Sequence, residues 1–288
     1  ADLSCTECHN DTALISGKQA AWQGSVHGSG IATAYAGGRP ACAGCHSGGG
    51  FSARIAAGIT DPSKVETADA SPSRPDCRAC HQIHTTYTVA DWALEATDLV
   101  PLYAVEGATY DGGTGNLCVN CHQPRRVFPA AEAGVIKGIS THWGPHHGPQ
   151  SSMLLGVGGA GVEGGPSPHY AIVENTCVAC HMGEGDAHSF EPNVAACQAC
   201  HADTKNFDIN GVQTEVEAMA NELGELLVAA GVLSENSAEG HPSVTEAPEN
   251  VALALWNWLY VHHEDKSMGV HNSAYTKALL QAGLDAMK

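Results

Sequence analysis

The sequence predicts a fold that is mostly irregular and α-helical, with little or no β-sheet. Glycine is abundant at 33 of 288 residues, and aromatic side chains make up only 6%. Such a chain forms few long strands, and we expect much of it to be loop. Helical periodicity is evident after residue 205. The length permits a sizeable hydrophobic core, but this composition does not favour a conventional one, so we expect something other than side chains to supply part of the interior.

The chain is strongly acidic, which narrows the classes of partner. It has 13 Lys+Arg against 31 Asp+Glu, a formal net charge of −18. This balance argues against nucleic acid, since phosphate neutralisation needs clustered basic residues, and against an anionic lipid surface. It favours cationic or mineral partners, or simply keeps the protein dispersed. No run of 18 apolar residues is present, so no transmembrane segment is expected. We interpret Ala1 as a mature N-terminus left after signal cleavage.

All 12 cysteines fall into one pattern, C-x-x-C followed at once by histidine. This pattern is the signature of c-type haem attachment. Two thiols add to the two vinyl groups on one edge of the porphyrin, and the next residue then reaches the iron as proximal ligand. We therefore expect six covalently bound haems of the c type, held by Cys5, Cys8, Cys42, Cys45, Cys77, Cys80, Cys118, Cys121, Cys177, Cys180, Cys197 and Cys200. The proximal ligands are His9, His46, His81, His122, His181 and His201.

Other uses of paired cysteines fit this pattern less well. Zinc sites use two pairs per metal and do not require a histidine after each pair. Thioredoxin-like pairs occur once, near a βαβ pattern, and disulfides do not fix this spacing. Since covalent attachment of haem takes place outside the cytoplasm, we expect an extracellular or cell-surface location, with the periplasm as the alternative.

The second axial ligand of each iron is also expected to be histidine. Of 17 histidines, six are proximal, so 11 remain for six irons. Two histidines on each iron would give a lower potential than histidine with methionine. The first choices for the distal ligands are His27, His84, His146, His169, His188 and His271, with His142 and His147 in reserve.

The position of His84 carries a structural implication. It lies three residues after proximal His81, on the proximal side of that haem. We therefore expect His84 to ligate a neighbouring haem, which would hold two haems close together. The cluster from His142 to His147 is ambiguous and is expected to supply one or two ligands.

Not every remaining histidine is expected to bind iron. His262 and His263 stand near a predicted helix end, where a cation is favoured by the dipole, and we interpret them as structural or solvent-facing. His241, which precedes a proline, is interpreted as a loop residue.

The attachment motifs divide the chain into two predicted regions. Residues 1–205 carry all six motifs and form a hexahaem-binding region, in which the haems themselves serve as the core. Residues 206–288 carry none and are predicted to be a helical region packed on it. Its three helices are predicted from apolar periodicity between Val212 and Leu227, over 249–263, and from a cap at Asn272 or Ser273 to about Met287.

Two segments resemble known multihaem cytochromes. The stretch Asp265–Tyr275, with its Gly-Val-His-Asn sequence, resembles the helical region of the pentahaem nitrite reductase and octahaem cytochrome superfamily. That resemblance implies that His271 is an axial ligand. The segment Trp143–Gln150 is similar to extracellular multihaem relatives of that superfamily. The chain departs from the nitrite reductases in having no C-x-x-C-K motif, the lysine-ligated catalytic site.

The short, acidic, glycine-rich hexahaem chain also resembles the filament-forming extracellular cytochromes of metal-reducing microbes. This resemblance implies a homo-polymer that carries electrons to other redox proteins or to extracellular metal or mineral acceptors. Because the subunits are acidic, assembly would rely on apolar contacts, haem stacking or shared ligands, and we predict that one distal histidine comes from a neighbouring subunit. We therefore predict an electron-transfer protein rather than an enzyme. The alternative is a multihaem reductase of nitrogen or sulfur oxyanions, which would need one haem with an open site.

Overall fold

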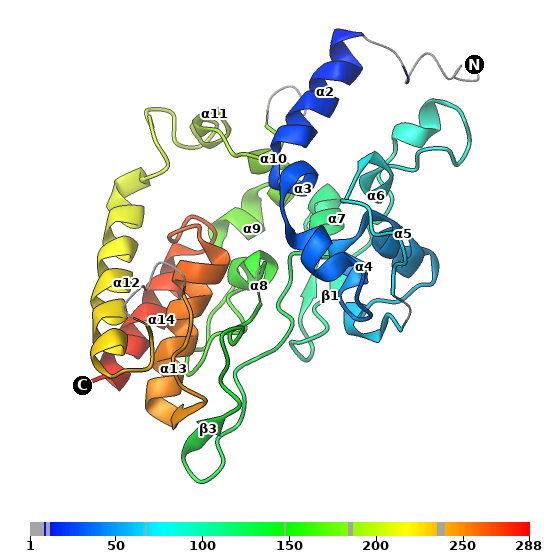
Figure 1. Ribbon diagram of the computed structural model, residues 1–288. Helices are drawn as coiled ribbons and strands as arrows, with labels where there is room; N and C mark the ends of the chain where they lie inside the picture. The colour runs from blue at the N-terminus through cyan, green and yellow to red at the C-terminus, as the bar shows by residue number, and fades with distance from the viewer. Residues whose placement is uncertain (1–8, 10–11, 67, 147, 184–186, 235–239) are drawn as a thin grey trace. The chain divides into compact units, whose positions relative to one another are not determined.

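The computed structural model describes residues 9, 12–66, 68–146, 148–183, 187–234 and 240–288. The chain forms two compact units that alternate along the sequence, and each is described by itself. Unit 1 comprises Ala1–Val100, Asp111–Cys121 and Glu174–Ala202, and unit 2 comprises Pro101–Tyr110, His122–Val173 and Asp203–Lys288 (Figure 1). The boundary at 205 was placed by haem attachment rather than by compactness, and it stays a prediction.

Unit 1 is built from short helices joined by irregular segments. Its α-helices are α2 (Ala13–Gly24), α3 (Val26–Ser29), α4 (Ala43–His46), α5 (Gly48–Ala56), α6 (Cys77–Cys80), α7 (Asn116–Val119), α10 (Thr176–His181) and α11 (Val194–Gln198). Single turns η1 (Thr33–Gly37), η2 (Pro62–Lys64), η3 (Val89–Trp92) and η4 (Gly113–Gly115) complete it. Several of these helices begin at a polar cap. Ser47, for example, accepts a hydrogen bond from the backbone N–H of Gly50 at the start of α5.

One buried apolar cluster of unit 1 contains predicted haem-attachment residues. Buried Phe51, Ala79 and Leu117 pack with half-buried neighbours that include Cys80 and Cys121. Other apolar residues of unit 1, such as Val65 and Val119, are also buried. That haems complete this interior stays a prediction.

Unit 2 is organised around longer helices. It contains α8 (Gln150–Leu155), α9 (Pro168–Ile172), η5 (Ile209–Gly211), α12 (Val212–Ala229), α13 (Glu249–Trp258), the π-helix η7 (Leu259–Asp265) and α14 (Ser273–Ala286). Strands β3 (Val135–Lys137) and β4 (Glu246–Pro248) pair antiparallel, with Ile136 opposite Ala247. A second two-stranded sheet joins β1 (Val100–Pro101) and β2 (Thr109–Tyr110). The prediction of little β-sheet is confirmed over the described chain.

The three C-terminal helices follow the sequence pattern with one difference. Helix α12 spans the predicted apolar repeat, and the side chain of Asn272 caps α14 by accepting from Tyr275 N at 3.2 Å. The helix predicted over 249–263 ends as an α-helix at Trp258 and continues as η7 to Asp265. A π-helix inserts an extra residue per turn and is frequent at functional sites.

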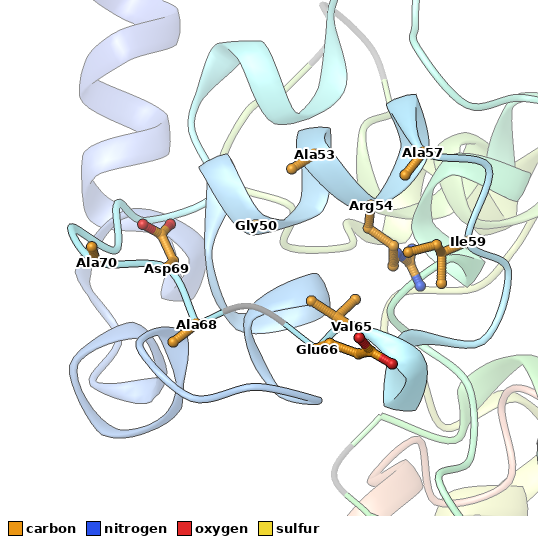
Figure 2. Close-up of a pocket in the computed structure, with 10 residues that line it drawn as sticks. All are labelled: Gly50, Ala53, Arg54, Ala57, Ile59, Val65, Glu66, Ala68, Asp69 and Ala70. Carbon is orange, nitrogen blue, oxygen red and sulfur yellow. The ribbon is translucent and has the colours of Figure 1, made fainter.

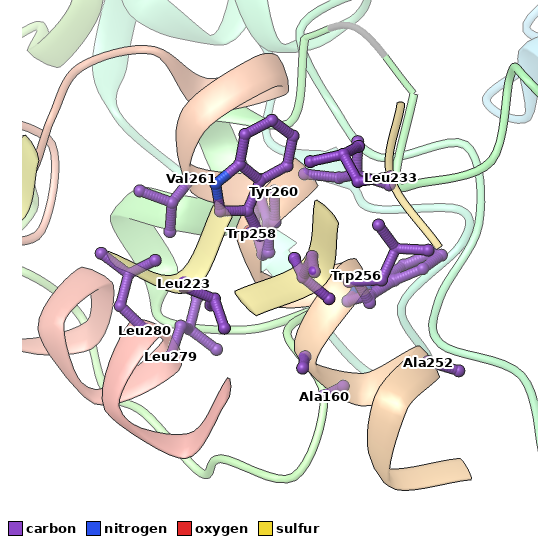
Figure 3. Close-up of a cluster of buried hydrophobic side chains, with 14 of the residues drawn as sticks. Ala160, Leu223, Leu233, Ala252, Trp256, Trp258, Tyr260, Val261, Leu279 and Leu280 are labelled. Carbon is purple, nitrogen blue, oxygen red and sulfur yellow. The ribbon is translucent and has the colours of Figure 1, made fainter. Parts of the chain in front are cut away.

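A hydrophobic core built from side chains fills unit 2, although the composition did not favour a conventional core. Trp256, Trp258 and Tyr260 are all 0–2% exposed and pack among the leucines of α12 and α14 (Figure 3). The indole N–H of Trp258 donates to Ala220 O at 2.8 Å, so burial leaves no polar atom of that ring unsatisfied. Trp143 and Tyr275, from other segments of unit 2, are buried in the same cluster. Among the described residues, no helix is long and apolar enough to cross a membrane.

Candidate haem-binding sites

Each described attachment motif lies on a helical turn that places its cysteines and histidine together. In the second, third and sixth motifs the histidine N–H donates to the carbonyl of the first cysteine, at 3.0 Å from His46, 2.8 Å from His81 and 2.8 Å from His201. This bond closes one helical turn, so both thiols and the imidazole emerge from a single short element. The fifth motif lies within α10.

The first and fourth motifs need separate description. Cys5 and Cys8 of the first motif lie outside the described residues, and His9 alone of that motif is described. The fourth motif begins in α7, and the backbone N–H of Cys121 donates to Cys118 O at 3.1 Å. None of the ten described cysteines is in a disulfide.

The rings of two proximal histidines are oriented by hydrogen bonds to backbone carbonyls. His81 Nδ1 lies 2.7 Å from Trp92 O, and His181 Nδ1 lies 2.9 Å from Phe190 O. A carbonyl can only accept, so Nδ1 carries the proton in both rings. This hydrogen bond leaves Nε2 directed away from the carbonyl, which is the orientation that a metal-binding imidazole needs.

Three further predicted ligands in unit 2 are oriented in the same way. His169 Nδ1 donates to Val270 O at 2.7 Å, one residue before His271. His271 Nδ1 lies 2.7 Å from Oδ1 of Asp265, a carboxylate whose side chain is fully buried. His122 Nδ1 lies 3.1 Å from Gln150 Oε1. Predicted ligands of both kinds, proximal and distal, are therefore held with Nε2 directed away from the protein partner.

Two proximal histidines face a predicted distal histidine at the spacing that one iron requires. The ring centres of His9 and His84 are 6.1 Å apart, and those of His81 and His188 are 6.3 Å apart with planes 22° from parallel. A metal-bound imidazole nitrogen lies about 2 Å from its metal, so two imidazoles on opposite sides of one iron have centres about 6 Å apart. Both pairs match this spacing. His84 is adjacent in sequence to the third motif but faces His9 of the first motif.

The loop that carries His84 is held by one buried carboxylate. Asp91 accepts hydrogen bonds from the backbone N–H of His84 at 3.0 Å, Thr86 at 2.7 Å and Tyr87 at 3.0 Å. Burial acts to raise the pKa of Asp91, but these bonds and that from the Thr86 hydroxyl outweigh it and lower the pKa. His84 and Tyr87 have φ values of +67° and +57°, a strained conformation that the anchored loop enforces.

The attachment cysteines of different motifs lie against one another within unit 1. Hydrogen bonding to the Cys45 thiol, followed by burial, raises the pKa of the Cys121 thiol, and hydrogen bonding to Cys177 does the same for Cys118. Burial raises the pKa of the Cys80 thiol to about 11. Burial contributes to all three shifts, so these cysteines lie in apolar surroundings, which suit the apolar vinyl edge of a porphyrin.

The remaining predicted ligands are less fully defined by their contacts. The ring of His27 meets that of Phe190 edge-on at 4.7 Å. His146 has a φ of +82° and His142 is exposed, whereas His147 lies outside the described residues.

One histidine pair was not expected from the sequence. His241 and His263 have ring centres 6.4 Å apart, and His241 Nδ1 donates to Thr141 O at 3.0 Å. Gly240, with φ +60°, permits this approach, because a Cβ there would lie 2.4 Å from His263 Nδ1. Neither histidine follows a C-x-x-C pair, so the spacing assigns them no haem of this chain. Nothing in the local sequence signalled the contact.

The sequence matches no protein-family model. No curated protein matches it either. In structure, 94% of the chain superposes on 50% of the outer cell wall cytochrome OcwA, with a TM-score of 0.59 and 20% identity. A second similar structure is an undecahaem cytochrome from the S-layer of Carboxydothermus ferrireducens, with a TM-score of 0.49 and 19% identity over 85% of this chain and 37% of that one. This chain spans about half the length of OcwA. The likeness to OcwA confirms that the chain has a mostly helical fold similar to that of this cytochrome.

Proposed function

We propose that this chain binds six c-type haems and transfers electrons between them. The observation that carries the proposal is the set of six C-x-x-C-H motifs, of which the second, third, fifth and sixth lie on single helical turns with cysteines and histidine side by side. Bound haem would supply reversible one-electron chemistry at iron, and the protein would set ligation, spacing and electrostatics. The haems would fill the interior of residues 1–205, with residues 206–288 as the helical region beside them.

We assign both axial ligands at two haems from the ring pairs. The first haem would be held between His9 and His84, and the third between His81 and His188, because each pair has the separation of two imidazoles on one iron. The other distal ligands are proposed to be His27, His146, His169 and His271, with His142 and His147 in reserve. With every iron six-coordinate, no haem would offer an open catalytic site.

Contact between cysteines of different motifs supports transfer between haems. Cys121 touches Cys45, and Cys118 touches Cys177, so the second, fourth and fifth haems would be anchored at adjoining points of unit 1. Electron transfer between haems requires that they lie close together. A chain that fixes the positions of the attachment cysteines also fixes which haems are neighbours. The fourth haem would therefore lie between the second and the fifth along the electron path.

We further propose that the protein acts at the cell surface or outside the cell, as a homo-polymer that passes electrons to other redox proteins or to metal or mineral acceptors. The net charge of −18 suits cationic or mineral partners. In unit 1, Val26 and Ile31 are 82% and 83% exposed, and a neighbouring subunit could cover such side chains.

A haem count and an optical spectrum of the purified secreted chain would test the proposal. We expect six haems per chain by intact mass, a wholly low-spin ferric spectrum, and reversible reduction by dithionite. Fewer than six haems would contradict the attachment assignment, and a high-spin fraction would favour a reductase of nitrogen or sulfur oxyanions. Electron micrographs of the same sample would separate a polymer, seen as long ordered fibres, from discrete particles.

A further inference from the structure

The side chain of Arg54, on α5, is buried although it carries a charge. It is 1% exposed, and its Nη2 group donates to Asn120 O at 3.0 Å. Its Nε and Nη1 groups are buried without a hydrogen-bond partner. Within the described chain no carboxylate lies within ion-pair distance of it, and its guanidinium carbon is 5.3 Å from the centre of the Phe51 ring. A buried, incompletely paired guanidinium is costly, so its position calls for a functional reason.

Arg54 stands where two haem-attachment motifs meet. Asn120, whose carbonyl it binds, lies between Cys118 and Cys121 of the fourth motif. The thiol of Cys45, from the second motif, points to the same carbonyl oxygen at 3.9 Å. The positive charge is therefore one hydrogen bond away from the anchors of two haems.

The carboxylates nearest to Arg54 do not neutralise its positive charge. Its side chain lines a hollow of about 310 Å³ together with Val65, Glu66 and Asp69 (Figure 2). Asp69 is engaged elsewhere, by the hydroxyl of Ser47 and by Ser71 N at 3.0 Å, and these hydrogen bonds lower its pKa. Glu66 is exposed, where water screens it. A buried charge is screened much less, so Arg54 dominates the local field.

We propose that Arg54 raises the reduction potential of the haems attached at Cys45 and at Cys118 and Cys121, and so makes this junction the preferred place of the first electrons. The inference rests on the proposed function. Reduction adds one electron, drawn from a low-potential donor, to a ferric iron and lowers its charge by one. A fixed positive charge nearby stabilises the reduced form. No proton is exchanged, because arginine stays protonated throughout.

Potentiometric titration of the full, haem-loaded chain with dithionite tests the proposal. The variant Arg54→Gln removes the charge but keeps hydrogen-bond donors. In it, two of the six haems should titrate at a lower potential than in the wild type, and these two haems should account for about one third of the total absorbance change. Lys137→Gln is the control, since Lys137 lies outside the attachment motifs, has a side chain 59% exposed and forms an ion pair with Glu132 at 3.1 Å. We expect it to titrate as the wild type does, because solvent screens the lost charge.

A titration of Arg54→Gln that superposes on the wild type, with six low-spin haems present, would overturn the inference. If this variant is not recovered with six haems, Arg54→Lys decides. A buried lysine sheds its proton as pH rises, so its two haems should fall in potential between about pH 6 and about pH 10, unlike those of the wild type. The same pH response in both proteins would refute the inference. A wild-type chain with fewer than six haems would instead refute the proposed function.

Discussion

Replacing His84 by alanine should convert one haem, and only one, from low-spin to high-spin iron. The His84 ring is 6.1 Å from that of His9, the spacing of two imidazoles on a shared iron. With six attachment motifs, the variant should show high-spin bands with roughly one sixth of the total haem intensity. The same haem should rise in potential, since it loses a basic ligand. Electron paramagnetic resonance and a redox titration on the purified protein measure both effects.

A neighbouring tyrosine supplies the control for this variant. The Tyr87 ring stacks on His84 with centres 5.7 Å apart, so its phenol could replace the missing imidazole. Tyr87→Phe alone should leave the spectrum unchanged, and the double variant removes the replacement ligand. If the double variant keeps six wholly low-spin haems, His84 is not an axial ligand and the use of ring spacing to assign ligands is wrong.

Four other changes should have distinct results. His188→Ala should make the third haem high-spin while the spectrum of the first haem stays unchanged, as resonance spectra would show. The Asp91 carboxylate should stabilise the His84 loop fully above pH 3.8, the ordinary pKa of an aspartate, and lose this effect as the pH falls through its lowered pKa. The haem spectrum should therefore change on acidification in the wild type, and this acid-dependent change should be absent in Asp91→Asn. Asp265→Asn should weaken the bond to His271, make that imidazole less basic and raise the potential of one haem, whereas an unchanged titration would show that His271 ligates no iron. Asn257→Ala removes three buried hydrogen bonds and should lower the free energy of unfolding by about 3 kcal/mol in denaturant titrations, with unchanged haem spectra.

Local chemistry is the reason that the sequence alone predicts attachment sites. Covalent bonding to a porphyrin edge needs two thiols and an imidazole within one helical turn, so C-x-x-C-H defines each site without reference to the rest of the chain. The cap of α14 at Asn272 was predictable for the same reason, because a capping side chain acts on a backbone N–H three residues away.

Contacts between segments that are distant in the sequence could not be predicted from the sequence alone. Which distal histidine faces which proximal histidine depends on how loops fold back, and His81 meets His188 from another part of unit 1. The approach of His241 to His263 depends on a glycine conformation that no local pattern announces.

By itself the sequence determined the number of C-x-x-C-H motifs, and it predicted the cofactor class and the proximal histidines, because these follow from residue order within five positions. Tertiary structure alone decided that unit 2 has its own aromatic core, that a buried carboxylate orients His271, and that Arg54 meets the attachment turn of the fourth motif. Burial and long-range hydrogen bonding depend on the whole fold. They determine the environment of each site, whereas the residue order determines its chemistry.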